Sequence, residues 1–343
     1  MKAARLHEYG DDRLHLDEVP DPTIQGPHDV IVRIGGAGVC RTDLHVMEGI
    51  WRGIQDPRLP YTLGHENAGW VEEVGPSVTT VRRGDAVIVH PLMTDGVCPA
   101  CRRGEDMHCE HGEFPGLNVD GGFAQYLRTL ERSTLKLEEG LAPSDVAAYA
   151  DAGLTAYRAV KKATAVLPPG SRCAVIGIGG LGHIGVQCLR AMSGAEIIAV
   201  DVSDEALQMA KRMGADSVVK AGEDAVEHVR ELTGGKGVEA VLDFVGEQGT
   251  TVQGPAMLTV GGTYFVIGYG GRVDLSAIEI ISREISVVGS LVGSFTELSE
   301  LMALAAQGKV KLETREYSLE DVNAALADLR DGRLHGRGVL VPA

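Results

Sequence analysis

The feature that most constrains this chain is a glycine-rich turn, Gly177-Ile178-Gly179-Gly180-Leu181-Gly182, which follows an apolar strand at 173–176 and precedes a helix at about 182–193. Glycines in this pattern permit a tight turn and a close approach of the backbone to a pyrophosphate, whose charge is stabilised by the helix N-terminus. The turn therefore predicts a dinucleotide site. The alternative is that the glycines only pack the helix against the strand.

An acidic residue follows the turn at the distance that a dinucleotide site requires. Asp201 ends the next predicted strand, 196–200, about 20 residues beyond the glycines. A carboxylate there can accept hydrogen bonds from the adenosine ribose and repels a 2′-phosphate, and the segment 202–205 supplies no arginine or lysine. The pattern favours NAD over NADP, unless Asp201 only begins a turn.

Helical and strand patterns alternate along the middle of the chain, after an alanine-rich helix predicted at 144–160. This alternation predicts an α/β domain with a doubly wound parallel sheet. The further predicted strands are 217–219, 238–243, 263–267 and 284–288, and the further helices are 203–213, 223–232 and 247–258.

The two ends of the chain differ from this middle part. Up to about residue 130 the sequence has short β-rich segments broken by glycine and proline, such as 30–34, 68–74 and 85–89, which predict a compact, barrel-like β domain. Amphipathic helices at 296–307 and 319–330 and a strand at 338–341 close the chain. A length of 343 residues accommodates two domains.

Charge and hydropathy exclude several classes of partner. Lys and Arg number 32 against 48 Asp and Glu, a formal net charge of −16, which argues against a nucleic-acid partner. No apolar run approaches the roughly 20 residues that cross a bilayer. The first residues also lack the apolar stretch of a secretory signal, so the sequence predicts a cytoplasmic protein without a membrane contact.

Three of the six cysteines lie close together, in the pattern Asp95-x2-Cys98-x2-Cys101-x7-Cys109. Four ligands at this spacing can surround one tetrahedral zinc if the loop folds back on itself, which predicts a closed structural site. The fourth ligand is open, because aspartate is a harder donor than a thiolate and His108 and His111 are nearby. The alternative is three reduced cysteines without a metal.

A second set of possible metal ligands is spread along the chain as Cys40, the pair His65-Glu66, and Asp151. One thiolate, one imidazole and one carboxylate leave an open position on zinc, as a catalytic site requires. Their spacing in the sequence alone does not show that residues so far apart form one site.

The run Gly64-His65-Glu66-x2-Gly69-x5-Gly75-x2-Val78 resembles the signature of the zinc-containing medium-chain alcohol dehydrogenases. The Cys40 segment, the cysteine loop and the glycine turn follow in that family's order, so the resemblance spans essentially the whole chain. It implies a GroES-like catalytic domain, 1–152 and 294–343, around a Rossmann domain at 153–293, with the active site in the cleft between them.

The resemblance also implies roles for individual residues. Cys40, His65 and Asp151 would hold a catalytic zinc, with Asp43 orienting His65 and with Glu66 able to enter the metal shell. Thr42 would take the alcohol proton and His45 would pass it to solvent. Two Zn²⁺ ions per chain are expected, the second being a structural zinc held by Asp95, Cys98, Cys101 and Cys109.

Cofactor and substrate residues come from the same resemblance. The cofactor, NAD, would be bound by Arg41, Gly177, Gly179, Gly180, Leu181, Gly182, Asp201, Ile267 and Arg337. The substrate pocket would be lined by Trp51, Leu92, Met93, Leu117 and Leu291. Two positions depart from the family pattern, because Asp95 replaces a structural cysteine and Asp151 stands where many relatives have cysteine.

The expected activity is hydride transfer between NAD(H) and an alcohol and its ketone or aldehyde, and the apolar pocket favours a secondary alcohol. The alternatives are a polyol, sugar or threonine dehydrogenase of the same superfamily and a non-catalytic NAD-binding protein. The apolar, strand-like segment 278–290 predicts a homo-oligomer, either a dimer or a tetramer. Cys173 and Cys188 are expected to pack in the core.

Overall fold

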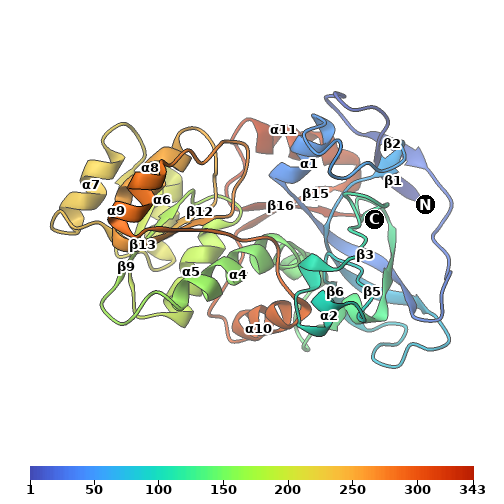
Figure 1. Ribbon diagram of the computed structural model, residues 1–343. Coiled ribbons are helices and arrows are strands. Elements are labelled where there is room, and N and C mark those ends of the chain that lie inside the picture. Colours follow the sequence, from blue (N-terminus) through green and yellow to red (C-terminus); the bar gives the residue numbers. More distant parts are fainter. The chain divides into compact units, whose positions relative to one another are not determined.

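The computed structural model describes residues 1–343, which form two compact units. The first unit comprises Met1–Ala152, Gly293–Ala306 and Leu312–Ala343. The second unit comprises Gly153–Val292 and Gln307–Lys311. Figure 1 shows the elements of both units in their sequence colours.

The second unit contains a six-stranded sheet in which every pair of neighbouring strands is parallel. Apolar strands buried on both faces are typical of such a sheet, and the centres of β9 (Arg172–Ile176), β10 (Glu196–Asp201) and β12 (Val238–Asp243) are fully buried. The predicted doubly wound parallel sheet is therefore confirmed. The strand order is β11 (Ser217–Lys220), β10 (Glu196–Asp201), β9 (Arg172–Ile176), β12 (Val238–Asp243), β13 (Leu258–Val266) and β14 (Ser286–Gly289).

Helices connect these strands and cover the sheet (Figure 1). Parallel strands need crossover connections, and a helix provides the usual one. The helices of this unit are α4 (Ala152–Thr164), which begins at the boundary with the first unit, α5 (Gly182–Met192), α6 (Asp204–Arg212), α7 (Ala225–Leu232), α8 (Thr250–Met257) and α9 (Ala277–Arg283).

The first unit is built on two sheets. The larger sheet has the strand order β15 (Thr314–Ser318), β16 (Arg337–Val341), β3 (Asp29–Val39), β5 (Glu66–Val74), β6 (Ala86–Val89) and β8 (Thr134–Lys136), and β7 (Tyr126–Leu130) also pairs with β3. The smaller sheet has the order β2 (His15–Glu18), β1 (Lys2–Leu6) and β4 (Tyr61–Thr62).

Short helices fill the connections of the first unit. They are α1 (Arg41–Met47), α2 (Pro99–Arg102), α3 (Pro143–Val146), α10 (Phe295–Ala306) and α11 (Val322–Arg330), with single 3₁₀ turns at Asp106–His108, Glu131–Ser133, Ala147–Tyr149 and Leu319–Asp321. None of the helices in the chain combines the length and apolar character that crossing a membrane requires.

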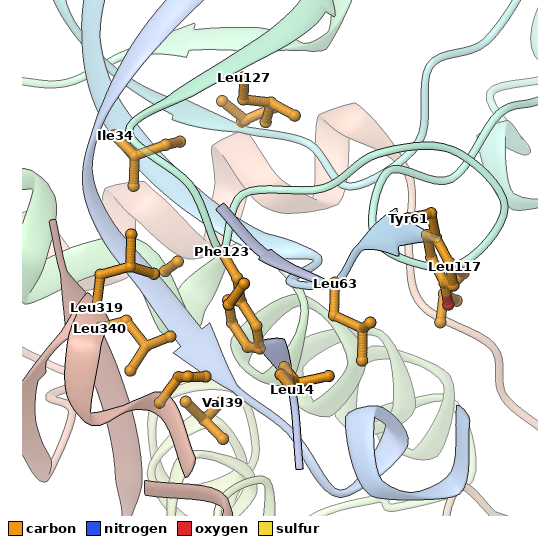
Figure 2. Packing of buried hydrophobic residues seen from close by; sticks show 14 of the residues in the cluster. Leu14, Ile34, Val39, Tyr61, Leu63, Leu117, Phe123, Leu127, Leu319 and Leu340 are labelled. Carbon is orange, nitrogen blue, oxygen red and sulfur yellow. The ribbon is translucent and has the colours of Figure 1, made fainter. Parts of the chain in front are cut away.

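The core of the first unit fixes the segment that carries His65. Phe123 is fully buried in a cluster with Leu63 and Leu340 (Figure 2). Gly64 has φ +96°, and a Cβ at this position would collide with the ring of Phe123. Glycine is therefore required here, both by the backbone conformation and by the packing.

Two predicted elements are wrong in their extent. The helix predicted at 144–160 is interrupted, because α3 is followed by a 3₁₀ turn and α4 starts only at Ala152. The amide of Ala152 donates to Glu66 Oε1 at 3.2 Å, so a tertiary contact overrides the helical propensity of the alanines. The segment 278–290 is not one strand, since α9 begins at the Ser276 N-cap and only β14 is extended.

Candidate metal and dinucleotide sites

The scattered metal-ligand set begins where β3 turns into α1. Cys40 is the N-cap of α1: its sulfur accepts from the amide of Thr42 at 3.4 Å, and its own amide donates to Asp43 Oδ2 at 2.8 Å. This reciprocal cap fixes the start of the helix. Thr42 and His45 are three residues apart, so they lie on one face of α1.

His65 lies between β4 and β5 and is 1% exposed. Its Nδ1 is 3.4 Å from Asp43 Oδ1, and its Nε2 is 3.6 Å from Asp151 Oδ2. Neither ring nitrogen has a hydrogen-bond partner. Burial disfavours the charged ring, but Asp43 and Cys40 outweigh burial and raise the pKa of His65 well above its usual range. A metal ion facing Nε2 would take the place of a proton there and satisfy this nitrogen, which has no hydrogen-bond partner.

The structure brings the predicted ligands together. One donor atom from each of Cys40, His65, Glu66 and Asp151 lies within 4.8 Å of the other three. Sulfur, imidazole nitrogen and carboxylate oxygen are the donors that zinc takes in proteins, and a zinc with three protein ligands keeps an open position. The donor set and the unpaired His65 nitrogen therefore fit a catalytic zinc.

Glu66 is held by an ion pair that the sequence did not indicate. Arg337, on β16, donates from Nε to Glu66 Oε2 at 3.0 Å and from Nη2 to Oε1, and both side chains are buried. Gly38 lies opposite Glu66 in the β3–β5 ladder, where a Cβ would collide with the carboxylate. The structure places the Arg337 guanidinium against Glu66, and the role of Arg337 at the pyrophosphate, which the resemblance implies, stays a prediction.

The cysteine loop forms a second cluster, in which Asp95, Cys98, Cys101 and Cys109 each have one donor atom within 4.8 Å of the others. Asp95 Oδ1 accepts from the amides of Val97 at 2.8 Å and Cys98 at 2.9 Å, while Asp95 Oδ2 is buried without a hydrogen-bond partner. The free oxygen fits the fourth position of a zinc site. His108 and His111 are not part of the cluster.

Backbone amides approach the sulfurs of this loop. The amide of Asp95 donates to Cys109 Sγ at 3.4 Å, and the amide of Cys101 donates to Cys98 Sγ at 3.5 Å. Hydrogen bonds from the amides of Cys101 and Glu110 lower the pKa of Cys98, whereas burial raises the pKa of Cys101 to about 12. A metal that deprotonates coordinating thiols would overcome the second effect.

The glycine turn and Asp201 meet in the second unit. Asp201 Oδ2 accepts from the amide of Ile178 at 2.6 Å, and Oδ1 accepts from the amide of Ser203 at 2.8 Å. Gly179 is exposed, and a Cβ there would meet no atom within 4 Å, whereas a Cβ at Gly182 would collide with the Gly177 carbonyl. The turn is thus tightly packed at Gly182 and accessible at Gly179, which fits a bound pyrophosphate.

The remaining predicted residues have different environments. Arg41 is exposed, Leu181 is half-buried, and Ile267, directly after β13, is 9% exposed. Leu92, Met93 and Leu117 are buried, and Trp51 packs against the core cluster that contains Leu117. Figure 2 shows Leu117 in this cluster. Leu291, in the second unit, is 52% exposed.

His90 is a buried residue that no sequence pattern indicated. Its Nδ1 lies 3.3 Å from the carbonyl oxygen of Leu92, and its Nε2 lies 3.0 Å from that of Gly293. Burial lowers its pKa. The ring joins the segment of Leu92 and Met93 to the start of the chain's last section, a contact that only the folded structure reveals. Cys173 and Cys188 are also fully buried.

Comparison with known proteins places these sites in a family. Residues 26–139 match the alcohol dehydrogenase GroES-like domain, and residues 180–307 match the zinc-binding dehydrogenase domain. The chain is 40% identical to the NAD-dependent alcohol dehydrogenase of Sulfurisphaera tokodaii, with all of both chains covered. It therefore belongs to the zinc-binding medium-chain alcohol dehydrogenase family, and the predicted GroES-like and Rossmann-like fold is confirmed.

Two further relatives illustrate how proteins similar to this chain differ. The crystal structure of the alcohol dehydrogenase from the archaeon Aeropyrum pernix superimposes with a TM-score of 0.97 at 52% identity, covering all of both chains. D-arabinose 1-dehydrogenase (NADP⁺) of Saccharolobus solfataricus is 36% identical, with 99% of this chain and 97% of the relative covered. Relatives of similar identity thus differ in substrate and cofactor.

Proposed function

We propose that this protein is an NAD-dependent zinc alcohol dehydrogenase that oxidises apolar secondary alcohols and reduces the corresponding ketones. The observation that carries the proposal is the cluster of Cys40, His65, Glu66 and Asp151, whose donor atoms converge within 4.8 Å. Full-length relatives that bear the name NAD-dependent alcohol dehydrogenase support the reaction class.

Zinc at this cluster would be held by Cys40, His65 and Asp151. When bound, it supplies a Lewis acid that makes the hydroxyl proton of an alcohol easier to remove and stabilises the negative charge that develops on oxygen. Asp43 orients His65 from the Nδ1 side and thereby keeps Nε2 directed toward the metal position.

Proton removal is assigned to helix α1. We assign acceptance of the alcohol proton to the Thr42 hydroxyl, because Thr42 follows the Cys40 ligand by two residues on α1. His45, one turn further along the same helix face, would pass the proton outward. Histidine suits this role because its ordinary pKa lies near neutrality.

The ion pair of Glu66 and Arg337 determines the charge that Glu66 contributes to this cluster. Burial raises the pKa of Glu66, and the two-pronged Arg337 guanidinium opposes that rise by favouring the ionised carboxylate, which would balance part of a zinc ion's charge. Removing either partner would leave the other charge buried and unpaired.

The second unit supplies the hydride acceptor site. NAD would place its pyrophosphate on the Gly177–Gly182 turn at the N-terminus of α5 and its adenosine ribose against Asp201. Asp201 and the acidic segment after it favour NAD over NADP, although the D-arabinose relative uses NADP.

The substrate assignment is based on the apolar side chains Trp51, Leu92, Met93 and Leu117 in the first unit. They suit a secondary, cyclic or aryl alcohol better than a polyol, which needs polar groups in the pocket. Oxidation of a sugar is the second candidate, and the D-arabinose relative supports it.

A substrate panel tests the proposal. Purified protein would be assayed with secondary alcohols, primary alcohols, polyols and aldoses, each with NAD and with NADP, alongside a zinc count per chain. We expect the highest kcat/KM for an apolar secondary alcohol with NAD, two zinc ions per chain, and loss of turnover after chelation that added zinc restores. Higher kcat/KM for an aldose, or turnover without zinc, would refute it.

We further propose that the protein is a homodimer or homotetramer that associates through the β14 edge. Ile278, Ile281 and Val287 are 73%, 71% and 42% exposed on α9 and this edge strand. An exposed apolar edge is unfavourable in a monomer. Light scattering would give the mass, and Ile281→Asp is expected to shift it toward the monomer, whereas a monomeric parent protein would contradict the proposal.

A further inference from the structure

Asp243 is a buried carboxylate that neither the metal clusters nor the glycine turn accounts for. It ends β12, is 0% exposed, and its Oδ1 accepts from the amides of Val245 and Gly246, both at 2.9 Å. Its backbone oxygen accepts from the amides of Ile267 at 3.0 Å and Gly268 at 2.9 Å. One residue therefore holds the loops that follow both β12 and β13.

Tyr264 fixes the second oxygen of this carboxylate. Its hydroxyl donates to Asp243 Oδ2 at 2.6 Å, and the tyrosine is 0% exposed. A Cβ at Gly254, on α8, would lie only 2.5 Å from the tyrosine ring, so the ring has little freedom. Burial and the nearby carboxylate raise the pKa of Tyr264, which keeps its donor proton in place.

The two loops held by Asp243 touch each other and the glycine turn. The amide of Gly271 donates to the carbonyl of Gly246 at 2.8 Å, and a Cβ at Gly246 would collide with the Gly268 carbonyl. A Cβ at Gly177 would collide with the Val245 side chain. The loops after β9, β12 and β13 thus form one continuous rim at the carboxyl ends of these neighbouring strands.

Ligands of open parallel sheets bind outside the carboxyl ends of the strands. The adenosine half of a dinucleotide is assigned to Asp201 on β10, on one side of β9. The rim at β12 and β13 lies on the other side of β9. Because the proposed function puts the pyrophosphate on the glycine turn after β9, the nicotinamide half would extend over this rim.

We infer that Asp243 and Tyr264 are positioning residues for the nicotinamide half of the cofactor, acting through the backbone of Val245, Gly246, Ile267 and Gly268. This inference rests on the proposed NAD-dependent function. Asp243 does not contact the cofactor. It holds the rim against which the nicotinamide ring is oriented, and the fixed rim lowers the entropy lost when the ring is placed for hydride transfer.

The test compares two ligands that share the adenosine and pyrophosphate groups. Calorimetric titration would give the affinities of the zinc-loaded protein for NADH and for ADP-ribose, which lacks nicotinamide. Asp243→Val removes the acceptor of both loop amides, so we expect about a tenfold loss of NADH affinity and less than about a twofold change for ADP-ribose. Equal losses for the two ligands would overturn the inference.

Conservative and matched variants keep the test decisive. Asp243→Asn retains an acceptor for both loop amides, and its side-chain NH2 can donate to the Tyr264 oxygen in place of the hydrogen bond that Asp243 accepts, so it should keep the parent's ratio of the two affinities. Asp216 holds the amide of Ile197 at 2.7 Å at the opposite end of the sheet, and Asp216→Asn should leave the ratio unchanged. If Asp243→Val does not fold, Tyr264→Phe provides the test through the same ratio of NADH affinity to ADP-ribose affinity. We then expect a loss of about threefold in NADH affinity alone.

The outcomes separate this inference from the proposed function. If the parent protein binds NADH and the variants leave the affinity ratio unchanged, the inference fails while the function stands. If the parent protein binds NADH with a ratio that Asp243 controls but oxidises no alcohol, the proposed function fails and the inference stands. A parent protein that does not bind NADH refutes both.

Discussion

The two metal-ligand clusters of the first unit each have four donors, but they are built in opposite ways. The cysteine-loop cluster draws on residues 95–109, and backbone amides of the same loop donate to its sulfurs and carboxylate. The scattered cluster joins Cys40, His65, Glu66 and Asp151 through a helix cap, a strand ladder and an interrupted helix. The first cluster is closed by its own loop, whereas the second depends on the whole unit.

This difference indicates a division of roles. A loop with three thiols and little secondary structure gains its order from a bound metal, because folding and binding are then coupled. The scattered cluster lies on β-sheet and helix elements that a large apolar core already holds. Loss of metal from the scattered cluster should therefore abolish chemistry and spare the fold, while loss of metal from the loop should do the reverse.

The largest effect is expected at the scattered cluster. His65→Ala removes a ligand, so kcat for alcohol oxidation should fall by about a thousandfold or more, because the Lewis-acid contribution is several kcal/mol. The melting temperature and NADH affinity should stay close to those of the parent. Stopped-flow or steady-state kinetics would measure kcat, and calorimetry would measure the melting temperature and the NADH affinity. A collapse of the fold would contradict the division of roles.

A smaller but still large effect is expected at the cysteine loop, on stability rather than chemistry. Cys101→Ala should lower the zinc count by one and reduce the melting temperature by about 10 °C, as loss of about 3 kcal/mol implies for a unit of this size. The folded fraction should retain its kcat. Cys188→Ala, in a buried thiol outside both clusters, is the matched control, because it shows the cost of removing a core sulfur alone.

The two clusters also differ in how far the sequence could predict them. Spacing alone indicated the cysteine loop, because its ligands are close along the chain. The scattered ligands could be joined only through the family resemblance, since strand pairing brings Gly38 opposite Glu66 and no local pattern encodes that register. The pairing of Glu66 with Arg337, 271 residues apart, was not predictable for the same reason.

The fold shows the same limit. Alternating apolar strands and helices predicted the parallel sheet, because each buried strand carries its pattern locally. The prediction of one helix over 144–160 was wrong, because the amide of Ala152 donates to Glu66. The prediction of one strand-like segment over 278–290 was wrong, because Ser276 caps the unpredicted helix α9. Asp243 was part of a predicted strand, but the two loops that it holds could not be read from its neighbours in sequence.

The third prediction concerns the carboxylate that distinguishes the loop from a four-cysteine site. Asp95→Asn keeps an acceptor for the amides of Val97 and Cys98 but removes the charge, so zinc should bind about tenfold more weakly and the melting temperature should fall by about 3 °C. Asp95→Cys should restore or raise both values. Competition with a chromophoric chelator measures the affinity, and unchanged binding in Asp95→Asn would remove Asp95 from the ligand set.

The smallest effect is expected at Glu131, which serves as a reference for the prediction at Asp95. Glu131 anchors the amides of Thr79 at 2.6 Å and Thr80 at 2.8 Å through one oxygen, much as Asp95 anchors its loop, but it has no thiolates beside it. Burial opposes ionisation, yet these hydrogen bonds outweigh it and lower the pKa of Glu131 to about 2. Glu131→Gln should lower the melting temperature at pH 7 by about 1 to 2 °C, a loss that metal ions do not change.

The pH dependence of that small effect has a defined sign. Because the folded pKa lies below the ordinary value of 4.5, the stabilisation is fully present above pH 4.5 and is lost as the pH falls through about 2. Urea midpoints of the parent and Glu131→Gln should therefore converge below pH 4.5, whereas Glu139→Gln, at an exposed position, corrects for net charge. If Asp95→Asn showed the same pH profile and no zinc dependence, Asp95 would be an ordinary loop anchor and the cysteine loop would have only three ligands.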